Sequence, residues 1–241
     1  IMNQIPYSTY LDKVYGCFLG KTVIGTLGAP YEGIKMPLEL PFKPEMINTM
    51  LPNDDLDLQI VWLYAMENLP PETVDCKVLG EMWLSYVTPH WNEYGLGKSN
   101  LKRGIPAPMS GDYDNDWRHS NGAWIRSEVW ATVAPAMPHV AAKYAMEDAM
   151  VDHGAGEGTI AAAFVAAAFN SASLVEGNSS CVGIVGTLRT DTDGMIISAG
   201  QVQVAAVVVA SLISVLSGIV QNRLIILSGV FPVAVCVSTN Q

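Results

Sequence analysis

Two alanine-rich segments joined by a glycine-rich turn occupy residues 138–169, with the sequence PHVAAKYAMEDAMVDHGAGEGTIAAAFVAAAF. Alanine has the highest intrinsic helix propensity, so this stretch predicts helices over Pro138–Met150 and Glu157–Phe169. The second segment is apolar all round, which is typical of a buried helix. The glycines between the segments indicate a helix-connecting turn or a close approach of the backbone to a ligand; they are Gly154, Gly156 and Gly158.

The rest of the chain up to residue 169 also indicates mainly helix. Helices are predicted over Tyr10–Val23 and Leu56–Glu67, and loops over Gly25–Pro44 and Tyr86–Asn121. The apolar spacing of the second helix places four residues on one face, namely Leu56, Ile60, Leu63 and Tyr64. The valine-rich stretches late in the chain show no clean alternation of period two. We therefore predict a single all-α domain over residues 1–241.

Composition excludes several classes of function. The chain has 241 residues and a formal net charge of −10, from 23 acidic and 13 basic residues. An acidic protein repels phosphate backbones, which argues against nucleic-acid binding. The four cysteines form no CxxC pair and are too far apart to indicate zinc or a disulfide scaffold. Residues 1–10 lack the pattern of a signal peptide, so a cytoplasmic location is expected.

The C-terminal third is poor in charge and rich in apolar residues. The stretch Val204–Val220 is almost wholly apolar and just short of the roughly 20 residues that a membrane-spanning helix needs. Its serines and glycine favour close packing inside a helical protein, so we expect no membrane span. A helical membrane-associated protein stays an alternative.

Two acidic clusters precede predicted helices. The first is PNDDLD at Pro52–Asp57, and the second is TDTDG at Thr190–Gly194. Each cluster alone is an ordinary helix start, because aspartates favour the positive end of a helix dipole. If the clusters meet in space, Asp54, Asp55, Asp191 and Asp193 supply four carboxylates, and neighbouring hydroxyl and amide groups add the oxygen donors that hard cations prefer. A third acidic run, Asp112–Asp116, lacks the glycine and glutamate of a calcium loop and favours a solvated or substrate-side loop.

Five segments in chain order resemble motifs of the ADP-ribosylglycohydrolase family. Asn53–Asp55 is similar to its T-D-D metal motif, and Thr190–Asp193 is similar to its late D-T-D-T motif. The other three resemble its opening helix with a G-A-P-x-E loop, its N-G-A-x-x-R segment and its histidine-containing turn; they are Tyr15–Gly33, Ser120–Arg126 and Asp152–Gly158. The resemblance extends over residues 15–193.

This resemblance implies a compact orthogonal multi-helix bundle with two Mg²⁺ or Mn²⁺ ions in a central cleft. It implies a hydrolase that cuts the glycosidic bond between ADP-ribose and a protein side chain or a small molecule. Carried over by position, the metal ligands would be Asn53, Asp54, Asp55, Asp191 and Asp193. The residues that contact the substrate would be Glu32, Asn121, Gly122, His153, Gly156 and Glu157.

The expected reaction is attack by water on the anomeric carbon, through an oxocarbenium-like transition state. The bound cations would orient a ribose hydroxyl and lower the pKa of the water. Asp55 or Asp191 would accept the proton of the water, while Glu32 would lie near the substrate. The sequence shows no G-x-S-x-G or Ser-His-Asp pattern of a serine hydrolase.

Two positions depart from the family pattern. Asn53 stands in place of a threonine, and Gly194 stands where a threonine ligand is usual. The segment between Phe169 and Asp191 is also shorter than the family pattern. Two alternatives therefore stay open, a catalytically impaired ADP-ribose-binding protein of the same fold and an unrelated helical metal hydrolase. The sequence does not specify which linkage is cut.

Overall fold

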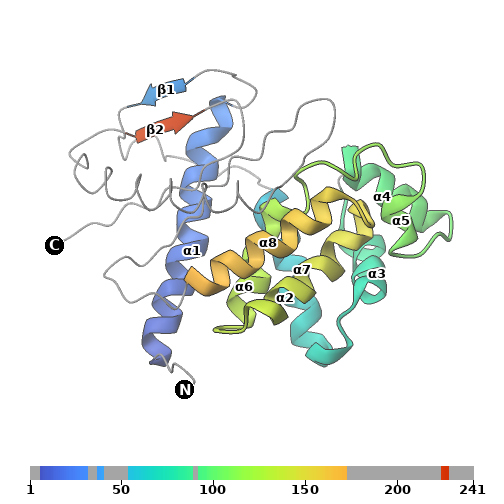
Figure 1. Cartoon of the computed structure of the whole chain (residues 1–241), viewed down its shortest axis with the longest axis horizontal. Coiled ribbons are helices and arrows are strands. Elements are labelled where there is room, and N and C mark those ends of the chain that lie inside the picture. Colours follow the sequence, from blue (N-terminus) through green and yellow to red (C-terminus); the bar gives the residue numbers. More distant parts are fainter. Residues whose placement is uncertain (1–5, 32–36, 41–53, 89–91, 173–223, 228–241) are drawn as a thin grey trace. The chain divides into compact units, whose positions relative to one another are not determined.

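The structure is a computed structural model, and it describes residues 6–31, 37–40, 54–88, 92–172 and 224–227. These residues form eight α-helices, several short 3₁₀ turns and one pair of short strands. The elements belong to two compact units (Figure 1). Helices α2 to α8 form the larger unit, whereas α1, β1 and β2 belong to the smaller unit.

The smaller unit contains one long helix. Helix α1 spans Tyr7–Gly28 and continues into a 3₁₀ turn at Ala29–Tyr31. The helix predicted over Tyr10–Val23 is thus confirmed, and it extends into the predicted loop. Strand β1 (Pro37–Leu40) pairs antiparallel with β2 (Leu224–Leu227), and this pair was not predicted.

The larger unit is entirely helical in its described residues. Helix α7 contacts five other helices and lies at the centre of the unit, alongside α8 (Figure 1). The helices are α2 (Asp54–Asn68), α3 (Cys76–Tyr86), α4 (Asn92–Lys102), α5 (Met109–Asp112), α6 (Glu128–Val133), α7 (Pro138–His153) and α8 (Glu157–Ala172). Two 3₁₀ turns lie between them, at Pro71–Thr73 and Trp124–Arg126.

Small and aromatic residues share the core of this unit. Several alanines of α7 and α8 are completely buried, and their small side chains let the two helices pack closely; they include Ala141, Ala149, Ala161 and Ala166. Trp62 lies between Trp83 and Trp130, with ring centroids 6.4 and 6.5 Å away. Buried aromatic rings of this size contribute much of the apolar area that stabilises a fold.

The helix predicted over Leu56–Glu67 is confirmed as α2, but its predicted apolar face is wrong. Ile60, Leu63 and Tyr64 are exposed, whereas the buried residues are Leu58, Gln59, Trp62 and Ala65. Trp62 has the largest apolar side chain of the helix, so the side of the helix that carries Trp62 is the side that packs into the core. Gln59 accompanies it because its amide finds partners inside, the Glu128 carboxylate and the Val129 N–H.

The loop predicted over Tyr86–Asn121 is wrong in part, because helices α4 and α5 lie within it. The α4 sequence contains two glycines and has weak helix propensity, but tertiary packing overrides it. Gly97 lies directly against Asp152 of α7, where a Cβ atom would be 3.0 Å from the Asp152 Cβ. Close packing between helices therefore decides this segment.

The two helices predicted over Pro138–Met150 and Glu157–Phe169 are confirmed as α7 and α8. The second is buried on one side and not all round, since Ile160 is 58% exposed. Among the helices that the structure describes, none is both long and apolar enough to cross a membrane. The apolar stretch Val204–Val220 lies outside the described residues.

Candidate functional site

A buried arginine connects three segments of the larger unit. Arg126 is fully buried and donates to the Asp148 carboxylate from Nε and Nη2, at 3.1 and 3.0 Å. It donates to the Asp152 carboxylate from Nη1 and Nη2, at 3.1 and 2.8 Å. Its Nη1 also donates to the Gly122 carbonyl oxygen at 2.8 Å. Arg126 therefore fixes the backbone at Gly122 to the C-terminal turns of α7.

Arg126 and Asp152 stabilise each other's charged form, whereas at Asp148 burial outweighs the effect of Arg126 and raises the pKa of that carboxyl. Burial by itself would lower the pKa of Arg126, but Asp148 and Asp152 outweigh it and hold that pKa well above its usual value. Burial would likewise raise the pKa of Asp152, but Arg126 and His153 outweigh it and lower that pKa to about 2. Arg126 and Asp152 are therefore both charged at neutral pH.

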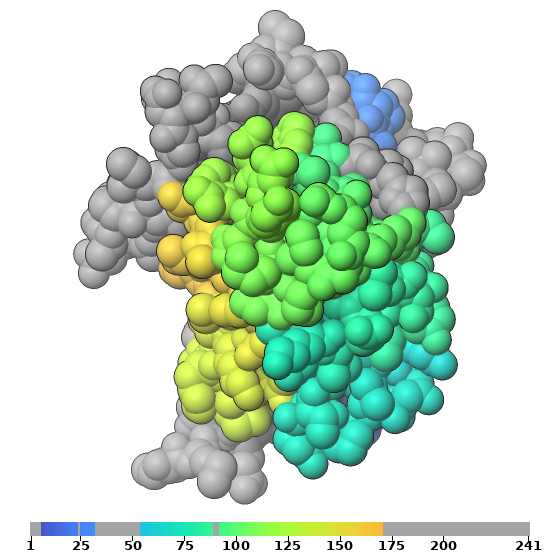
Figure 2. Space-filling view, turned by 90° about the vertical axis from the view of Figure 1, so that its right-hand side faces the viewer, coloured from blue at the N-terminus to red at the C-terminus, as the bar shows by residue number. Residues whose placement is uncertain are grey.

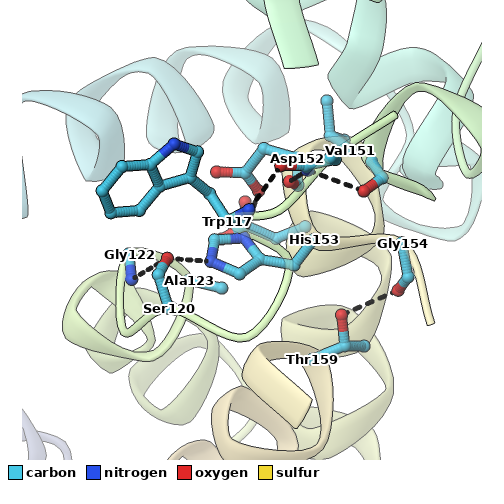
Figure 3. A network of polar contacts seen from close by, with 12 residues as sticks. Trp117, Ser120, Gly122, Ala123, Val151, Asp152, His153, Gly154 and Thr159 are labelled. Atoms are coloured by element: carbon cyan, nitrogen blue, oxygen red, sulfur yellow. Dashed lines mark hydrogen bonds and ion pairs between the residues drawn. The ribbon is translucent and has the colours of Figure 1, made fainter. Parts of the chain in front are cut away.

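His153, the last residue of α7, is completely buried between Ser120 and Asp152. Its Nε2 lies 2.9 Å from the Ser120 hydroxyl, as Figure 3 shows. Its Nδ1 lies 2.9 Å from Asp152 Oδ1, although this contact lacks the alignment of a hydrogen bond. The structure thus brings a serine, a histidine and an aspartate together, an arrangement that the sequence pattern did not indicate.

The turn after α7 packs against the loop that carries Asn121 and Gly122. The Gly158 N–H donates to the Arg118 carbonyl oxygen at 3.4 Å, and His119 Nδ1 contacts Glu157 Oε2. A Cβ atom at Gly158 would overlap the His153 ring. The structure therefore gathers five predicted substrate residues around this turn, namely Asn121, Gly122, His153, Gly156 and Glu157. Figure 2 shows the surface of the 100–125 segment between that of α3 and α4 and that of α7 and α8.

Asp112 holds the same turn from the other side. Gly154 has φ +52°, a conformation that favours glycine, and a Cβ atom there would overlap the Asp112 carboxylate. Asp112 Oδ1 accepts a hydrogen bond from the Ala155 N–H at 3.0 Å. Asp114 and Asp116 are exposed, as expected of a solvated loop. Asp112 instead has a structural role.

Sequence reasoning missed Glu93, in the first turn of α4. Glu93 is only 7% exposed, and its carboxylate lies so close to Gly122 that a Cβ atom there would overlap Oε1. Burial raises the pKa of Glu93, and Asp152 raises it further, while the nearby His153 and a hydrogen bond with Ser120 act in the opposite direction. No sequence signal marks this residue, because the segment was predicted to be a loop.

The acidic start of α2 reaches the same region. Asp54 and Asp55 are half-buried in its first turn, and Asp57 is exposed. Burial, and then the negative charge of Asp54, raise the pKa of Asp57. The charge of Asp54 also contributes to the raised pKa of Tyr94, which is raised mainly by burial. Tyr94 packs against Arg126, whose guanidinium carbon lies 5.7 Å from the ring centroid. Asp54 therefore lies within electrostatic reach of the arginine network.

The predicted metal ligands are described only in part. Asn53, Asp191 and Asp193 lie outside the described residues, as does Glu32. Within the described part of the chain, no three His, Cys, Asp or Glu residues group as they would to hold a metal. Asp54 and Asp55 offer adjacent hard oxygen donors, and burial, followed by the negative charge of Asp54, raises the pKa of Asp57 in the same turn. These donors fit Mg²⁺ or Mn²⁺, provided that other segments supply further ligands.

Comparison with known proteins agrees with the sequence resemblance. The family model for ADP-ribosylglycohydrolase matches residues 6–220, which include all five motifs. No curated protein and no solved structure matched the chain. The predicted all-α class is confirmed, since the described residues are overwhelmingly helical and the family is all-α. With most of its length matched, this chain belongs to the ADP-ribosylglycohydrolase family.

Proposed function

We propose that the protein is a metal-dependent hydrolase that cleaves the glycosidic bond between ADP-ribose and a protein side chain or a small molecule. The family match over residues 6–220 supports glycohydrolase activity in general. The observation that carries the specific proposal is the gathering of Asn121, Gly122, His153, Gly156 and Glu157 around one turn, beside the start of α2.

The arginine network gives this turn a fixed shape. Arg126 holds the Gly122 carbonyl, and the same guanidinium holds Asp152, the residue before His153. A substrate that contacts Asn121 and His153 would therefore meet groups positioned before it binds. Such preorganisation reduces the entropy that binding costs. In this proposal the pyrophosphate is held mainly by backbone N–H groups and helix starts.

Glu93 is the carboxyl group best suited to act as a general acid. Glycoside hydrolysis needs a group that gives a proton to the leaving atom and another that accepts a proton from water. A buried carboxyl with a raised pKa keeps its proton at higher pH than an exposed one. In this proposal Glu93 protonates the leaving group, Asp55 or Asp191 accepts the proton of water, and Glu32 orients the substrate.

Asn53, Asp54, Asp55, Asp191 and Asp193 would hold two Mg²⁺ or Mn²⁺ ions. These ions, when bound, would orient a ribose hydroxyl and lower the pKa of the attacking water. The negative charge of Asp54, which adds to the effect of burial in raising the pKa of Asp57, supports this assignment, because a cation bound at Asp54 would offset that charge.

Calorimetric titration of ADP-ribose tests the proposal. We expect binding in the presence of Mg²⁺ that is lost with excess chelator and in Asp54→Asn. Asp57→Asn is the matched control, since it removes a charge from the same turn without removing a proposed ligand, and it should bind normally. A folded protein that binds ADP-ribose in neither condition would overturn the ADP-ribose assignment.

Release of ADP-ribose from arginine, serine, nucleotide-base and small-molecule conjugates tests turnover. Cleavage of one class, abolished in Glu93→Gln with binding retained, would identify the linkage and support the acid role. Tight binding without cleavage of any conjugate would favour the catalytically impaired alternative. The departures from the family pattern at Asn53 and Gly194 are the reason to consider that alternative, because each replaces a threonine near the expected metal site.

A further inference from the structure

A buried glutamine joins the acidic start of α2 to the start of α6. Gln59, one turn after Asp55, is only 1% exposed, so its side-chain amide depends on partners inside the protein. Its Nε2 donates to the Asp55 carbonyl oxygen at 2.6 Å and to Glu128 Oε2 at 3.0 Å. Its Oε1 accepts a hydrogen bond from the Val129 N–H at 2.8 Å. Both the nitrogen and the oxygen of this amide are therefore hydrogen-bonded.

The bonds to α6 connect positions that are 69 and 70 residues apart in the chain, so local structure alone does not produce them. Val129 lies in the first turn of α6, where backbone N–H groups have no partner within their own helix. Gln59 supplies a partner for one of these groups, and Glu128 of the same turn accepts from Gln59 in return. The bond to the Asp55 carbonyl extends this connection to the first turn of α2.

The segment that begins α6 also carries the arginine network. Arg126 precedes Glu128 by two residues, and it donates to the Gly122 carbonyl oxygen and to the Asp152 carboxylate. Helix α2 contacts both α6 and the 3₁₀ turn that contains Arg126. One short segment is therefore hydrogen-bonded both to the residues around the candidate substrate turn and, through Gln59, to the acidic start of α2.

We propose that Gln59 and Glu128 are positioning residues that hold Asp54 and Asp55 in the arrangement that a divalent cation needs. The inference rests on the proposed function, in which these two aspartates are metal ligands. The groups that hydrogen-bond behind metal ligands orient those ligands and set the affinity of the site. Gln59 acts through the main chain of Asp55, and Glu128 acts through Gln59, so neither residue needs to contact the ion.

Titration of Mn²⁺ into the folded protein, with the free ion followed by electron paramagnetic resonance, tests the proposal without an activity measurement. Gln59→Met keeps the length of the side chain and removes all three hydrogen bonds. We expect its Mn²⁺ affinity to fall by about tenfold or more. Circular dichroism at the titration temperature verifies that the variant is folded, so that a loss of stability alone does not change the result. Wild-type affinity in folded Gln59→Met would overturn the proposal.

Two substitutions at Glu128 separate the hydrogen bond from the charge, and they keep the test decisive if Gln59→Met does not fold. Glu128→Gln and Glu128→Met both remove the negative charge, but only glutamine retains an oxygen that can accept from Gln59 Nε2. Glu128→Met should weaken Mn²⁺ binding by roughly tenfold, and Glu128→Gln should recover most of that loss. Equal losses in the two variants would show that charge and not the hydrogen bond governs the affinity, which contradicts a positioning role.

Asn100→Leu is the matched control. Asn100 is similarly buried, at 2% exposed, and its amide donates to the carbonyl oxygens of Ser110 and Tyr113 at 2.9 and 2.8 Å, which connects α4 to α5 and the residue after it. Its loss should lower stability and leave the Mn²⁺ affinity unchanged, and a fall equal to that of Gln59→Met would count against the proposal. A wild-type protein that binds no Mn²⁺ would overturn the proposed metal site together with this role, whereas equal binding by the wild type and Gln59→Met would overturn the role of Gln59 alone.

Discussion

Two acidic groups of the larger unit differ in how their charge is balanced. Asp148 and Asp152 are completely buried and contact the guanidinium of Arg126, and the pKa of Asp152 falls to about 2. Asp54, Asp55 and Asp57 crowd into the first turn of α2 at the edge of the same region, and there the pKa of Asp57 is raised. In the first group the guanidinium of Arg126 offsets part of the negative charge, although burial still raises the pKa of Asp148. In the second group burial, and then the charge of Asp54, disfavour the charged form of Asp57.

This difference separates a structural role from a functional one. Carboxylates that already contact a guanidinium have less to gain from an added cation, so the arginine network serves to position the turn around His153. Carboxylates that repel one another gain from a cation placed between them. The α2 start is therefore the better candidate for metal binding.

Removal of the Arg126 guanidinium should change the free energy of unfolding more than any other substitution considered below. Arg126→Met would leave two buried carboxylates without their cation and should lower the free energy of unfolding by about 3–5 kcal/mol. Urea denaturation followed by circular dichroism measures it. Arg118→Met, at an exposed position, should change stability by less than about 0.5 kcal/mol. Similar losses in both variants would show that the network does not stabilise the fold.

The pH dependence of stability should show the next largest effect. The pKa of Asp152 is about 2 in the folded protein and about 3.9 in an unfolded chain. Its stabilisation is therefore complete above pH 4 and is lost as the pH falls to 2, by about 2 kcal/mol. Unfolding curves from pH 5 to 2 should fall more steeply for the wild type than for Asp152→Asn. Equal slopes would refute the assignment.

Asp54→Asn tests whether the start of α2 binds a metal ion. In the wild type, Mg²⁺ should raise the midpoint of thermal unfolding, because a ligand of the folded state stabilises it. In Asp54→Asn the Mg²⁺ affinity should fall at least about tenfold, which corresponds to about 1.4 kcal/mol. Without metal, its stability should stay within about 0.5 kcal/mol of the wild type. A Mg²⁺ response equal to that of the wild type would exclude Asp54 as a ligand.

The smallest change in stability is expected for Asp57→Asn. Its raised pKa means that the charged form is disfavoured in the folded protein, so the cost appears as the pH rises and vanishes at low pH. Asp57→Asn should therefore stabilise the protein by a few tenths of a kcal/mol near pH 7 and not at all near pH 3. Thermal unfolding at both pH values measures this gain, and a loss at pH 7 would contradict the repulsion.

Much of the fold followed from local patterns. The alanine-rich segments around residues 138–169 predicted α7 and α8, because propensity and apolar composition agree there. The same reasoning failed for α4, whose glycines allow close packing against α7 but weaken the local helix signal. It also misplaced the buried face of α2, because a spacing rule cannot weigh Trp62 against Ile60.

The candidate site divides in the same way. The motifs identified Asn121, Gly122, His153 and Glu157 one by one, and the structure places them around one turn. Glu93 could not be found from sequence, since its chemistry depends on burial against Gly122 and on a hydrogen bond with Ser120. The motif resemblance assigned Asp54 to the metal site, but nothing in the local sequence indicated that Asp152 pairs with Arg126.

The sequence by itself determined the family, most of the helices and the positions of the residues that carry charge. These properties depend on residue type and on spacing over a few turns of chain. Only the tertiary structure decided which charges are balanced, because Arg126 must be brought to Asp148 and Asp152 on another helix and removed from water with them. Pairing and desolvation set the pKa of a carboxylate, and neither is a local property of the chain.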